Sequence, residues 1–306
     1  MNRYDFCLAW NWQYDLEFVN VLERACQEQG ISLFQVTPTN LTQTLDLLEA
    51  GQLSFHTYFD RASDADAGFM PLSEWARQNA VIYINRLRLA RHAWDKAAVH
   101  WQLVNSGLAT PKTLIIPPCS QEPNPMPPDL KILGERFVIK PAHGGGGRGV
   151  ITDATTWQQV LAARQEYPED HYLLQSFISP AILDSRPAWF RLIYCAGQII
   201  PCWWDQRTHI YTHLTDDDQL RFDLQPLSNI MIELALLSQL ELFSTEIAYT
   251  PAGEFVLVDY INDPIDLRLQ SKTLEGVPDQ IVEVIAQNLV SYVAAGCQAL
   301  PFYIRL

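Results

Sequence analysis

Apolar and polar positions follow two alternating patterns over the first part of the chain. Short apolar runs typical of buried strands are each followed by a segment with one apolar helical face; in residues 15–29, for example, Leu16, Val19 and Leu22 share a face. The predicted strands cover residues 4–10, 31–36, 55–59 and 81–84, and the predicted helices cover residues 15–29, 41–50 and 71–78. Alternation of strand and helix at this spacing is typical of a parallel sheet. We therefore expect an α/β fold that begins with a parallel α/β domain over residues 1–94.

The pattern changes after this domain. Residues 86–106 predict one long helix, and six prolines between residues 117 and 128 then indicate a stiff connector. We expect a second domain over residues 95–178 and a third over residues 179–306. The third contains predicted strands near residues 190–204 and 245–262 and predicted helices near residues 230–242 and 279–295.

Composition narrows the class of protein. The chain has 306 residues, of which 48% are hydrophobic and 18% charged, so it can form several packed domains. Its net charge of −14 disfavours a nucleic-acid partner, because acidic surfaces repel phosphate. We expect no membrane partner, because no apolar stretch is long enough to span a bilayer and no signal-peptide core is present. Six scattered cysteines without a CxxC pair favour reduced thiols in a cytoplasmic protein.

A glycine-rich segment between Lys140 and Val150 carries most of the chemical information. Consecutive glycines let the backbone approach a ligand, and their N–H groups can surround an anion. The spacing of Gly144, Gly146 and Gly149 formally matches the dinucleotide fingerprint, but the segment leads into a predicted strand instead of a helix. No Lys-Ser/Thr pair follows, so it is not a Walker loop either. We predict an anion-binding loop that joins two antiparallel strands.

The order of strand, Lys140-Pro, glycine loop and strand resembles the nucleotide lid of the ATP-grasp superfamily, which includes D-alanine–D-alanine ligase and glutathione synthetase. The resemblance covers nearly the whole chain. It implies an ATP-grasp architecture: an N-terminal parallel α/β domain, a small α+β nucleotide lid and a C-terminal α+β domain with an antiparallel sheet.

Four further motifs support this resemblance. They are Asp95-Lys96 at the entry to the lid; residues 172–178 as the hinge strand whose backbone meets adenine; Trp189-Phe190-Arg191, which matches the superfamily's Asp-x-Arg only at the arginine; and Glu246 with Asp259 as paired metal carboxylates on a hairpin. The glycine loop and the paired carboxylates are specific when they occur together.

The resemblance implies ATP and two Mg²⁺ ions as cofactors, and a role for each matching residue. The nucleotide-binding residues would be Lys96, Lys140, His143, Gly144, Gly145, Gly146, Gly147, Gln175, Ser176, Phe177, Ile178 and Asp184. The metal ligands would be Glu246, Asp259 and Asn262, whose side-chain oxygens suit Mg²⁺. Arg191 would approach the γ-phosphate, and Arg268 would hold a substrate carboxylate. Solvent exposure of His143 and a surface salt bridge at Arg268 or Arg61 stay open as simpler interpretations.

Two departures from the superfamily pattern bear on these roles. Asp259 and Asn262 are three residues apart, which places them on opposite faces of a regular strand. A bulge or strand end at Ile261 would bring them together, or Asp263 would replace Asn262. The usual acid after the hinge glutamine is replaced by Ser176, so the ribose contact moves to Asp184 or is absent.

The function that the resemblance implies is an ATP-dependent ligase. A small-molecule carboxylate would be activated as an acyl phosphate, and an amine would then displace phosphate, with release of ADP. A small-molecule kinase on the same scaffold and a nucleotide-binding module without catalysis are the alternatives. Fold does not determine substrate, so the identities of the carboxylate and the amine stay open, as does a homodimeric state.

Overall fold

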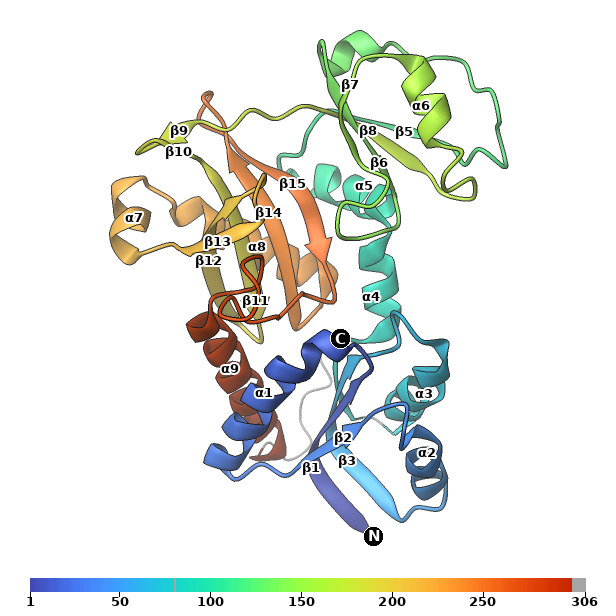
Figure 1. Ribbon diagram of the computed structural model, residues 1–306, viewed down its shortest axis with the longest axis vertical. Helices are drawn as coiled ribbons and strands as arrows, with labels where there is room; N and C mark the ends of the chain where they lie inside the picture. The colour runs from blue at the N-terminus through green and yellow to red at the C-terminus, as the bar shows by residue number, and fades with distance from the viewer. Residues whose placement is uncertain (80, 299–306) are drawn as a thin grey trace.

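The computed structural model describes residues 1–79 and 81–298, apart from the side chains of residues 297 and 298. Three larger sheets form three units along the molecule (Figure 1). The strands are β1 (Asn2–Trp10), β2 (Leu33–Val36), β3 (Leu53–Arg61), β4 (Ile82–Ile84), β5 (Thr113–Ile116), β6 (Phe137–Pro141), β7 (Ile151–Ala154), β8 (Tyr172–Ser176), β9 (Ile182–Leu183), β10 (Arg186–Pro187), β11 (Trp189–Cys195), β12 (Gln198–Asp205), β13 (Ile210–His213), β14 (Leu242–Tyr249) and β15 (Phe255–Asn262). The α-helices are α1 (Leu16–Gln29), α2 (Leu41–Glu49), α3 (Met70–Gln78), α4 (Leu87–Trp94), α5 (Lys96–Ser106), α6 (Trp157–Ala163), α7 (Asp216–Arg221), α8 (Gln225–Ser238) and α9 (Asp279–Gln298). The predicted α/β class is confirmed.

The first unit is a parallel sheet with the strand order β2-β1-β3-β4. Alternate residues of β1 face opposite sides of this sheet: Phe6 and Leu8 share a core with α1 and α9, whereas Cys7 and Ala9 share a core with α2 and α3. Both faces are therefore covered, which explains why β1 is apolar over most of its length. The carboxyl end of β3 reaches the third unit.

The connection to the second unit differs from the prediction. Residues 86–106 do not form one helix, because Asp95 is extended (φ −81°, ψ 91°) and separates α4 from α5. The side chain of Asp95 accepts hydrogen bonds from the backbone N of Ala97 and of Ala98, so it caps α5. The prediction is wrong because the helical pattern continues across Asp95, a residue type whose side chain competes for backbone donors.

The second unit, called the lid below, is an antiparallel sheet with the order β5-β8-β6-β7. Phe137 and Ile139 of β6 share a core with α6 on one face. Lys140 alternates with these residues and lies on the other face, which is turned toward the third unit. The glycine loop joins β6 to β7, which pair antiparallel as the sequence predicts.

The third unit is an antiparallel sheet with the order β13-β12-β11-β14-β15. Phe190 and Leu192 of β11 pack with α8 on one face. Trp189 and Ile193 lie on the opposite face, in a core that also contains α9 and α1. Helix α9 thus packs against the first unit as well as the third, as Figure 1 shows. The domain boundaries proposed at residues 94/95 and 178/179 stay a prediction.

The cysteines with described side chains are buried and unpaired: Cys7, Cys26, Cys119, Cys195 and Cys202. Burial raises the pKa of Cys195 to about 12, so this thiol stays protonated. The side chain of Cys297 lies outside the described residues. Among the helices that the structure describes, none is both long and apolar enough to cross a membrane.

Candidate active site

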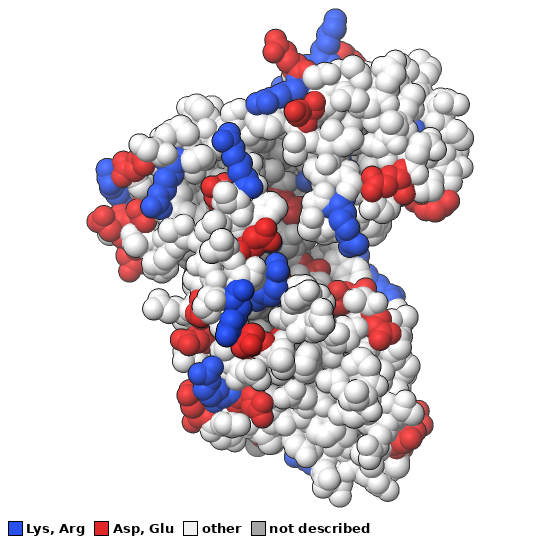
Figure 2. Space-filling model, viewed as in Figure 1, with Lys and Arg blue, Asp and Glu red and all other residues white. Residues whose placement is uncertain are grey.

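The space-filling view is hollowed between the lid and the third unit, and acidic and basic side chains surround this hollow, which we call the cleft (Figure 2). Three charged residues form a row across neighbouring strands on the sheet side of the cleft. Arg191 of β11 lies opposite Glu246 of β14, and Glu246 lies opposite Asp259 of β15. Directly opposed residues in antiparallel strands point to the same face, so the register brings these side chains together. We call them the charged row.

Two hydrogen bonds hold the central residue of the charged row. Glu246 Oε1 accepts from Arg191 Nη1 at 3.3 Å, and its Oε2 accepts from the indole N–H of Trp189 at 3.2 Å. Burial raises the pKa of Glu246 and the charge of Asp259 adds to this, whereas Arg191 opposes it. One guanidinium thus compensates two adjacent carboxylates, which leaves the row able to accept a further cation.

A bulge determines which residue follows Asp259 into this site. Ser244 lies opposite Asn262, and Glu246 lies opposite Asp259, so β15 uses one more residue than β14 between the two pairs. Asn262 therefore reaches the face of the charged row. Its Nδ2 is buried and has no hydrogen-bond partner among the described residues. The expected bulge is present, and it resolves the conflict with strand alternation.

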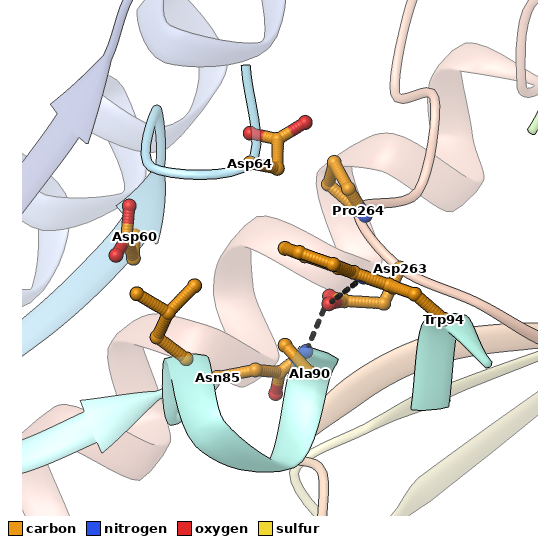
Figure 3. Close-up of a pocket in the computed structure, with 8 residues that line it drawn as sticks. Asp60, Asp64, Asn85, Ala90, Trp94, Asp263 and Pro264 are labelled. Carbon is orange, nitrogen blue, oxygen red and sulfur yellow. Dashed lines mark hydrogen bonds between the residues drawn. The ribbon is translucent and has the colours of Figure 1, made fainter. Parts of the chain in front are cut away.

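Asp263, the alternative ligand, points elsewhere. Its carboxylate accepts from Asn85 Nδ2 at 2.7 Å and from Trp94 Nε1 at 3.3 Å (Figure 3). These contacts face a small cavity of about 20 Å³ that is also lined by Asp60 and Asp64. Burial raises the pKa of Asp263 to about 6. Asp263 therefore belongs to the joint between the first and third units.

Lys140 lies across the cleft from the charged row. Its Nζ donates to the backbone O of Val258 at 3.0 Å and lies 5.1 Å from the centre of the Tyr260 ring. Lys140 is buried, and burial lowers its pKa to about 8, against the opposing effects of Asp259 and Glu246. A buried cation thus faces two half-buried carboxylates, which is typical of a site that binds charged ligands.

The glycine loop has the backbone conformations that glycine favours. Gly144, Gly146, Gly147 and Gly149 all have positive φ. At Gly149 a Cβ atom would also lie 2.8 Å from the Tyr167 ring, whereas the first three have no such obstacle. The loop is therefore open on one side and tightly packed at its end.

Lys96, predicted to bind phosphate, contacts the glycine loop itself. Its Nζ donates to the backbone O of Gly144 at 2.6 Å, and its backbone N donates to the backbone O of Ala142 at 3.0 Å. The first residue of α5 thus holds the base of the loop. A phosphate role for Lys96 stays a prediction, and it requires the Nζ–Gly144 bond to open.

His143 is held by Asp170, which the sequence analysis did not identify. The Asp170 carboxylate accepts from the backbone N of His143 at 2.8 Å and lies 2.9 Å from its Nδ1. This hydrogen bond raises the pKa of His143. Both residues line a pocket of about 520 Å³ between the loop and residues 166–170. His143 is exposed, so the solvent exposure that stayed open for it is present. Its contact with phosphate stays a prediction.

No protein-family model matches the sequence, and no curated protein matches it significantly. Solved structures do match over nearly the whole chain. A RimK-domain ATP-grasp protein from Sphaerobacter thermophilus is 19% identical, with a TM-score of 0.64 over 94% of this chain and 99% of that one. D-alanine–D-alanine ligase from Bacillus anthracis, complexed with ATP, is 11% identical, with a TM-score of 0.62 over 97% of each chain. The ATP-grasp ligase PsnB, complexed with minimal precursor, Mg and ADP, is 12% identical, with a TM-score of 0.62 over 96% of this chain and 99% of that one.

The chain has the ATP-grasp fold. The predicted hinge strand, residues 172–178, consists of β8 and the two residues after it. Gln175 is buried, and its side chain donates to Thr113 Oγ1 at 3.0 Å and to the Tyr260 hydroxyl at 2.7 Å. Ser176 Oγ accepts from the backbone N of Lys112. The Arg136 guanidinium lies 3.8 Å from the centre of the Phe177 ring. Base contacts by the backbone of residues 175–178 stay a prediction.

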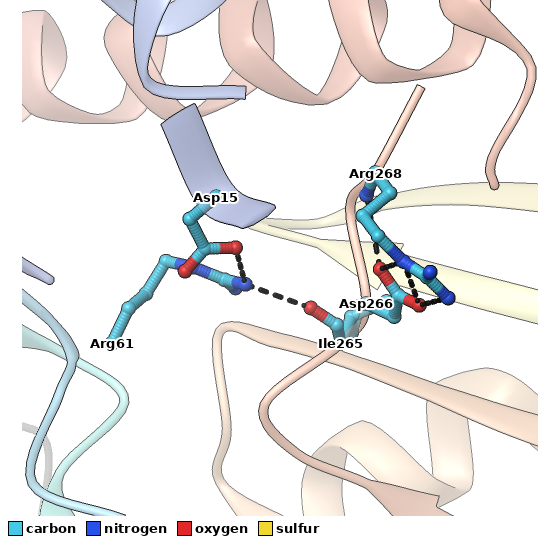
Figure 4. Close-up of polar contacts among 5 residues, drawn as sticks. All are labelled: Asp15, Arg61, Ile265, Asp266 and Arg268. Atoms are coloured by element: carbon cyan, nitrogen blue, oxygen red, sulfur yellow. Dashed lines mark hydrogen bonds and ion pairs between the residues drawn. The ribbon is translucent and has the colours of Figure 1, made fainter. Parts of the chain in front are cut away.

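Two predicted site residues have partners outside the charged row. Asp184 lies at the surface and pairs with Arg221. Arg268 follows β15 and donates to both carboxylate oxygens of Asp266 (Figure 4). Its guanidinium lies 5.8 Å from the centre of the Trp12 ring. The salt bridge that stayed open for Arg268 is therefore present. A ribose contact of Asp184 and a substrate contact of Arg268 remain predictions.

Arg61 forms a buried ion pair instead of a surface salt bridge. Its Nη2 lies 2.7 Å from Asp15 Oδ1 and donates to the backbone O of Ile265 at 3.0 Å (Figure 4). It thus joins the first unit to the segment that follows β15.

Several residues that support the candidate site were not predicted from the sequence. They are Trp189 and Ser244 beside the charged row, Asp170 at the glycine loop, and Tyr260 with His100 behind β15. A signal existed only for Trp189 and Ser244, each two residues from a predicted site residue on the same strand face. The others become neighbours only through tertiary packing.

Proposed function

We propose that the chain is an ATP-dependent ligase that joins a carboxylate to an amine and releases ADP and phosphate. The observation that carries the proposal is the charged row of Arg191, Glu246 and Asp259, which faces the buried Lys140 across one cleft. ATP carries about four negative charges, so its binding in an acidic protein needs local cations. Lys140 and Arg191 supply them, and Lys96 adds a third after release from Gly144.

The donor set on the sheet side fits Mg²⁺. Glu246 and Asp259 are carboxylates, and Asn262 adds an amide oxygen on the same face, so all three supply the oxygen ligands that Mg²⁺ prefers. No cluster of three or more His, Cys, Asp or Glu side chains suited to a metal occurs among the described residues, so the site depends on this mixed set and on phosphate oxygens. When bound, Mg²⁺ offsets the charge that develops on the transferred phosphoryl group.

The chemistry requires positioning and charge compensation more than a nucleophilic side chain. A substrate carboxylate oxygen bonds to the γ-phosphorus while the bond to the β,γ-bridging oxygen breaks, and ADP leaves. The amine nitrogen then attacks the acyl carbon, phosphate leaves, and the amine loses a proton. Arg191, in the charged row, would approach the γ-phosphate. The ATP-grasp ligases among the similar structures agree with this class of reaction.

The test is a screen of amino acids and small carboxylates, with and without amines, for Mg²⁺-dependent ADP release, followed by mass spectrometry of the products. Hydroxylamine added to an active mixture should convert the acyl phosphate into a hydroxamate. A stable phosphorylated product without hydroxamate would assign the chain to kinase chemistry. Absence of Mg-ATP binding would remove the proposal altogether.

A further inference from the structure

A buried polar network lies behind the candidate metal strand β15. The hydroxyl of Tyr260 lies 2.7 Å from Gln175 Nε2 and 2.8 Å from His100 Nδ1. All three residues are buried, with exposed fractions of 0% for Tyr260, 2% for Gln175 and 4% for His100. They come from β15, β8 and α5, so one hydroxyl connects a strand of the third unit to two elements on the lid side of the cleft.

The hydrogen bonds of this network run in one direction. The Gln175 amide nitrogen can only donate, so the Tyr260 oxygen accepts from it. The Tyr260 proton is then satisfied by donation to Nδ1 of a neutral His100. Burial, and secondarily the charge of Lys140, lowers the pKa of His100, in agreement with the neutral form. Gln175 also donates to Thr113 Oγ1, so β5 belongs to the same network.

The position of Tyr260 in the sequence gives the network its significance. Tyr260 follows Asp259 directly and lies two residues before Asn262, so its backbone sets the place of both candidate metal ligands. Gln175 lies within residues 172–178, the predicted hinge strand. Lys140 contacts the ring of Tyr260 as well as the backbone of Val258. One side chain therefore contacts both the hinge strand and the phosphate-side lysine.

We propose that Tyr260 is a positioning residue that fixes the spacing between the hinge strand β8 and the metal strand β15 through Gln175 and His100. The inference rests on the proposed function, because the spacing matters only if one ligand spans both strands. Such a ligand is a nucleoside triphosphate with its base at the hinge and its metal-bound phosphates at Glu246, Asp259 and Asn262. Tyr260 touches no reacting atom and acts through the strand that carries it.

The experiment compares two tyrosine variants of the full chain. Tyr260→Phe removes the hydroxyl and keeps the ring beside Lys140. Tyr83→Phe is the matched control, since Tyr83 is also buried and its hydroxyl donates to Asp60 Oδ2 at 2.7 Å, in the core of the first unit and away from the hinge strand. Calorimetry gives the dissociation constant of AMP-PNP in EDTA and in saturating Mg²⁺. The dissociation constant in EDTA divided by the dissociation constant in Mg²⁺ measures the coupling between metal and nucleotide, and this quotient is called the ratio below.

Tyr260→Phe should lower this ratio about tenfold and leave the constant in EDTA within about twofold, because only the metal-linked contacts depend on the position of β15. Tyr83→Phe should leave the ratio unchanged. Equal ratios in wild type and Tyr260→Phe would overturn the proposal, even if both variants lose thermal stability. If the wild type binds Mg-AMP-PNP but loss of the Tyr260 hydroxyl does not change the ratio, the proposed function still stands. If the wild type does not bind the nucleotide at all, both the positioning role of Tyr260 and the proposed function are wrong.

A second pair of variants keeps the proposal testable if Tyr260→Phe fails to fold. His100→Gln retains an acceptor for the Tyr260 hydroxyl, whereas His100→Leu does not. His100→Leu should lower the metal–nucleotide ratio, and His100→Gln should restore most of it. Equal ratios in these two variants would contradict a positioning role for the network.

Discussion

The two sides of the cleft hold their charges in different ways. On the sheet side, Arg191, Glu246 and Asp259 lie on paired strands, and the register alone sets their spacing. On the lid side, Lys140 and Lys96 donate to backbone carbonyl oxygens, and the glycine loop beside them is largely exposed. The sheet side is therefore organised in advance, whereas the lid contacts can be exchanged for contacts with a ligand.

The sheet side should be the more sensitive to loss of one charge. Asp259→Asn removes a carboxylate from the charged row, and we expect ADP release to fall by at least about 100-fold, the scale for losing an electrostatic contact in a closed site. Without metal, the thermal stability of Asp259→Asn should equal or exceed that of the wild type, because Asp259 raises the pKa of its half-buried neighbour Glu246.

Asp205→Asn, at the exposed end of β12, is the control and should keep full activity. Full activity in Asp259→Asn would remove the charged row from the site, whatever happens to stability.

On the lid side, Lys140→Met should weaken ATP binding by about 2–4 kcal/mol, since a charged partner is lost from a buried site. The free energy of unfolding should change little, because burial disfavours the charged form of Lys140, and the uncharged methionine avoids this penalty. Lys131→Met, an exposed change in the same unit, should bind ATP normally. Normal ATP affinity combined with easier unfolding of Lys140→Met would make Lys140 a structural residue.

Substitution by alanine should destabilise the protein at one glycine of the loop and have almost no effect at another. Gly149 has a φ of +71° and a Cβ there would lie 2.8 Å from the Tyr167 ring, so Gly149→Ala should cost about 2 kcal/mol of unfolding free energy. At Gly145 the φ is ordinary and nothing lies within 4 Å, so Gly145→Ala should change stability by less than about 0.5 kcal/mol. Urea unfolding of both variants checks this, and equal effects would contradict the described packing of the loop.

The smallest expected effect is a pH dependence of ATP binding. The pKa of Lys140 is about 8 without ligand, and phosphate oxygens beside it would raise that pKa. Binding then requires proton uptake above pH 8, so affinity should fall about tenfold between pH 7.5 and pH 9.5. Calorimetry in two buffers of different ionisation enthalpy measures the proton uptake. The dependence should disappear in Lys140→Met, and its persistence there would assign the titration to another group.

On the sheet side of the cleft, the sequence predicted the hairpin that carries the two carboxylates, but not which residue follows Asp259 into the site. The spacing of Glu246 and Asp259 and the turn between them indicated a hairpin, which β14 and β15 form. The choice between Asn262 and Asp263 depended on a bulge, and single residues of a strand do not report a bulge. Asp263 lies one residue from a site residue yet faces the first unit, which only the packed structure could reveal.

On the lid side, the sequence predicted the loop but not the residues that hold it in place. Glycine content identified the loop, but its anchors Lys96 and Asp170 come from other segments. The break at Asp95 was missed because helical periodicity reports apolar faces and not caps. Tyr260 was missed because a tyrosine inside an apolar strand is typical of an ordinary core residue.

Hydrogen exchange of the wild-type protein tests the central claim that one nucleotide contacts both sides of the cleft. Peptides covering residues 142–150 and 257–262 should be compared in buffer, with Mg²⁺ alone, and with saturating Mg-AMP-PNP. We expect protection to increase in both segments with the nucleotide, and more in the glycine loop, because its exposed backbone gains contacts. Unchanged protection of either segment at saturating nucleotide would contradict the claim that one nucleotide contacts both sides.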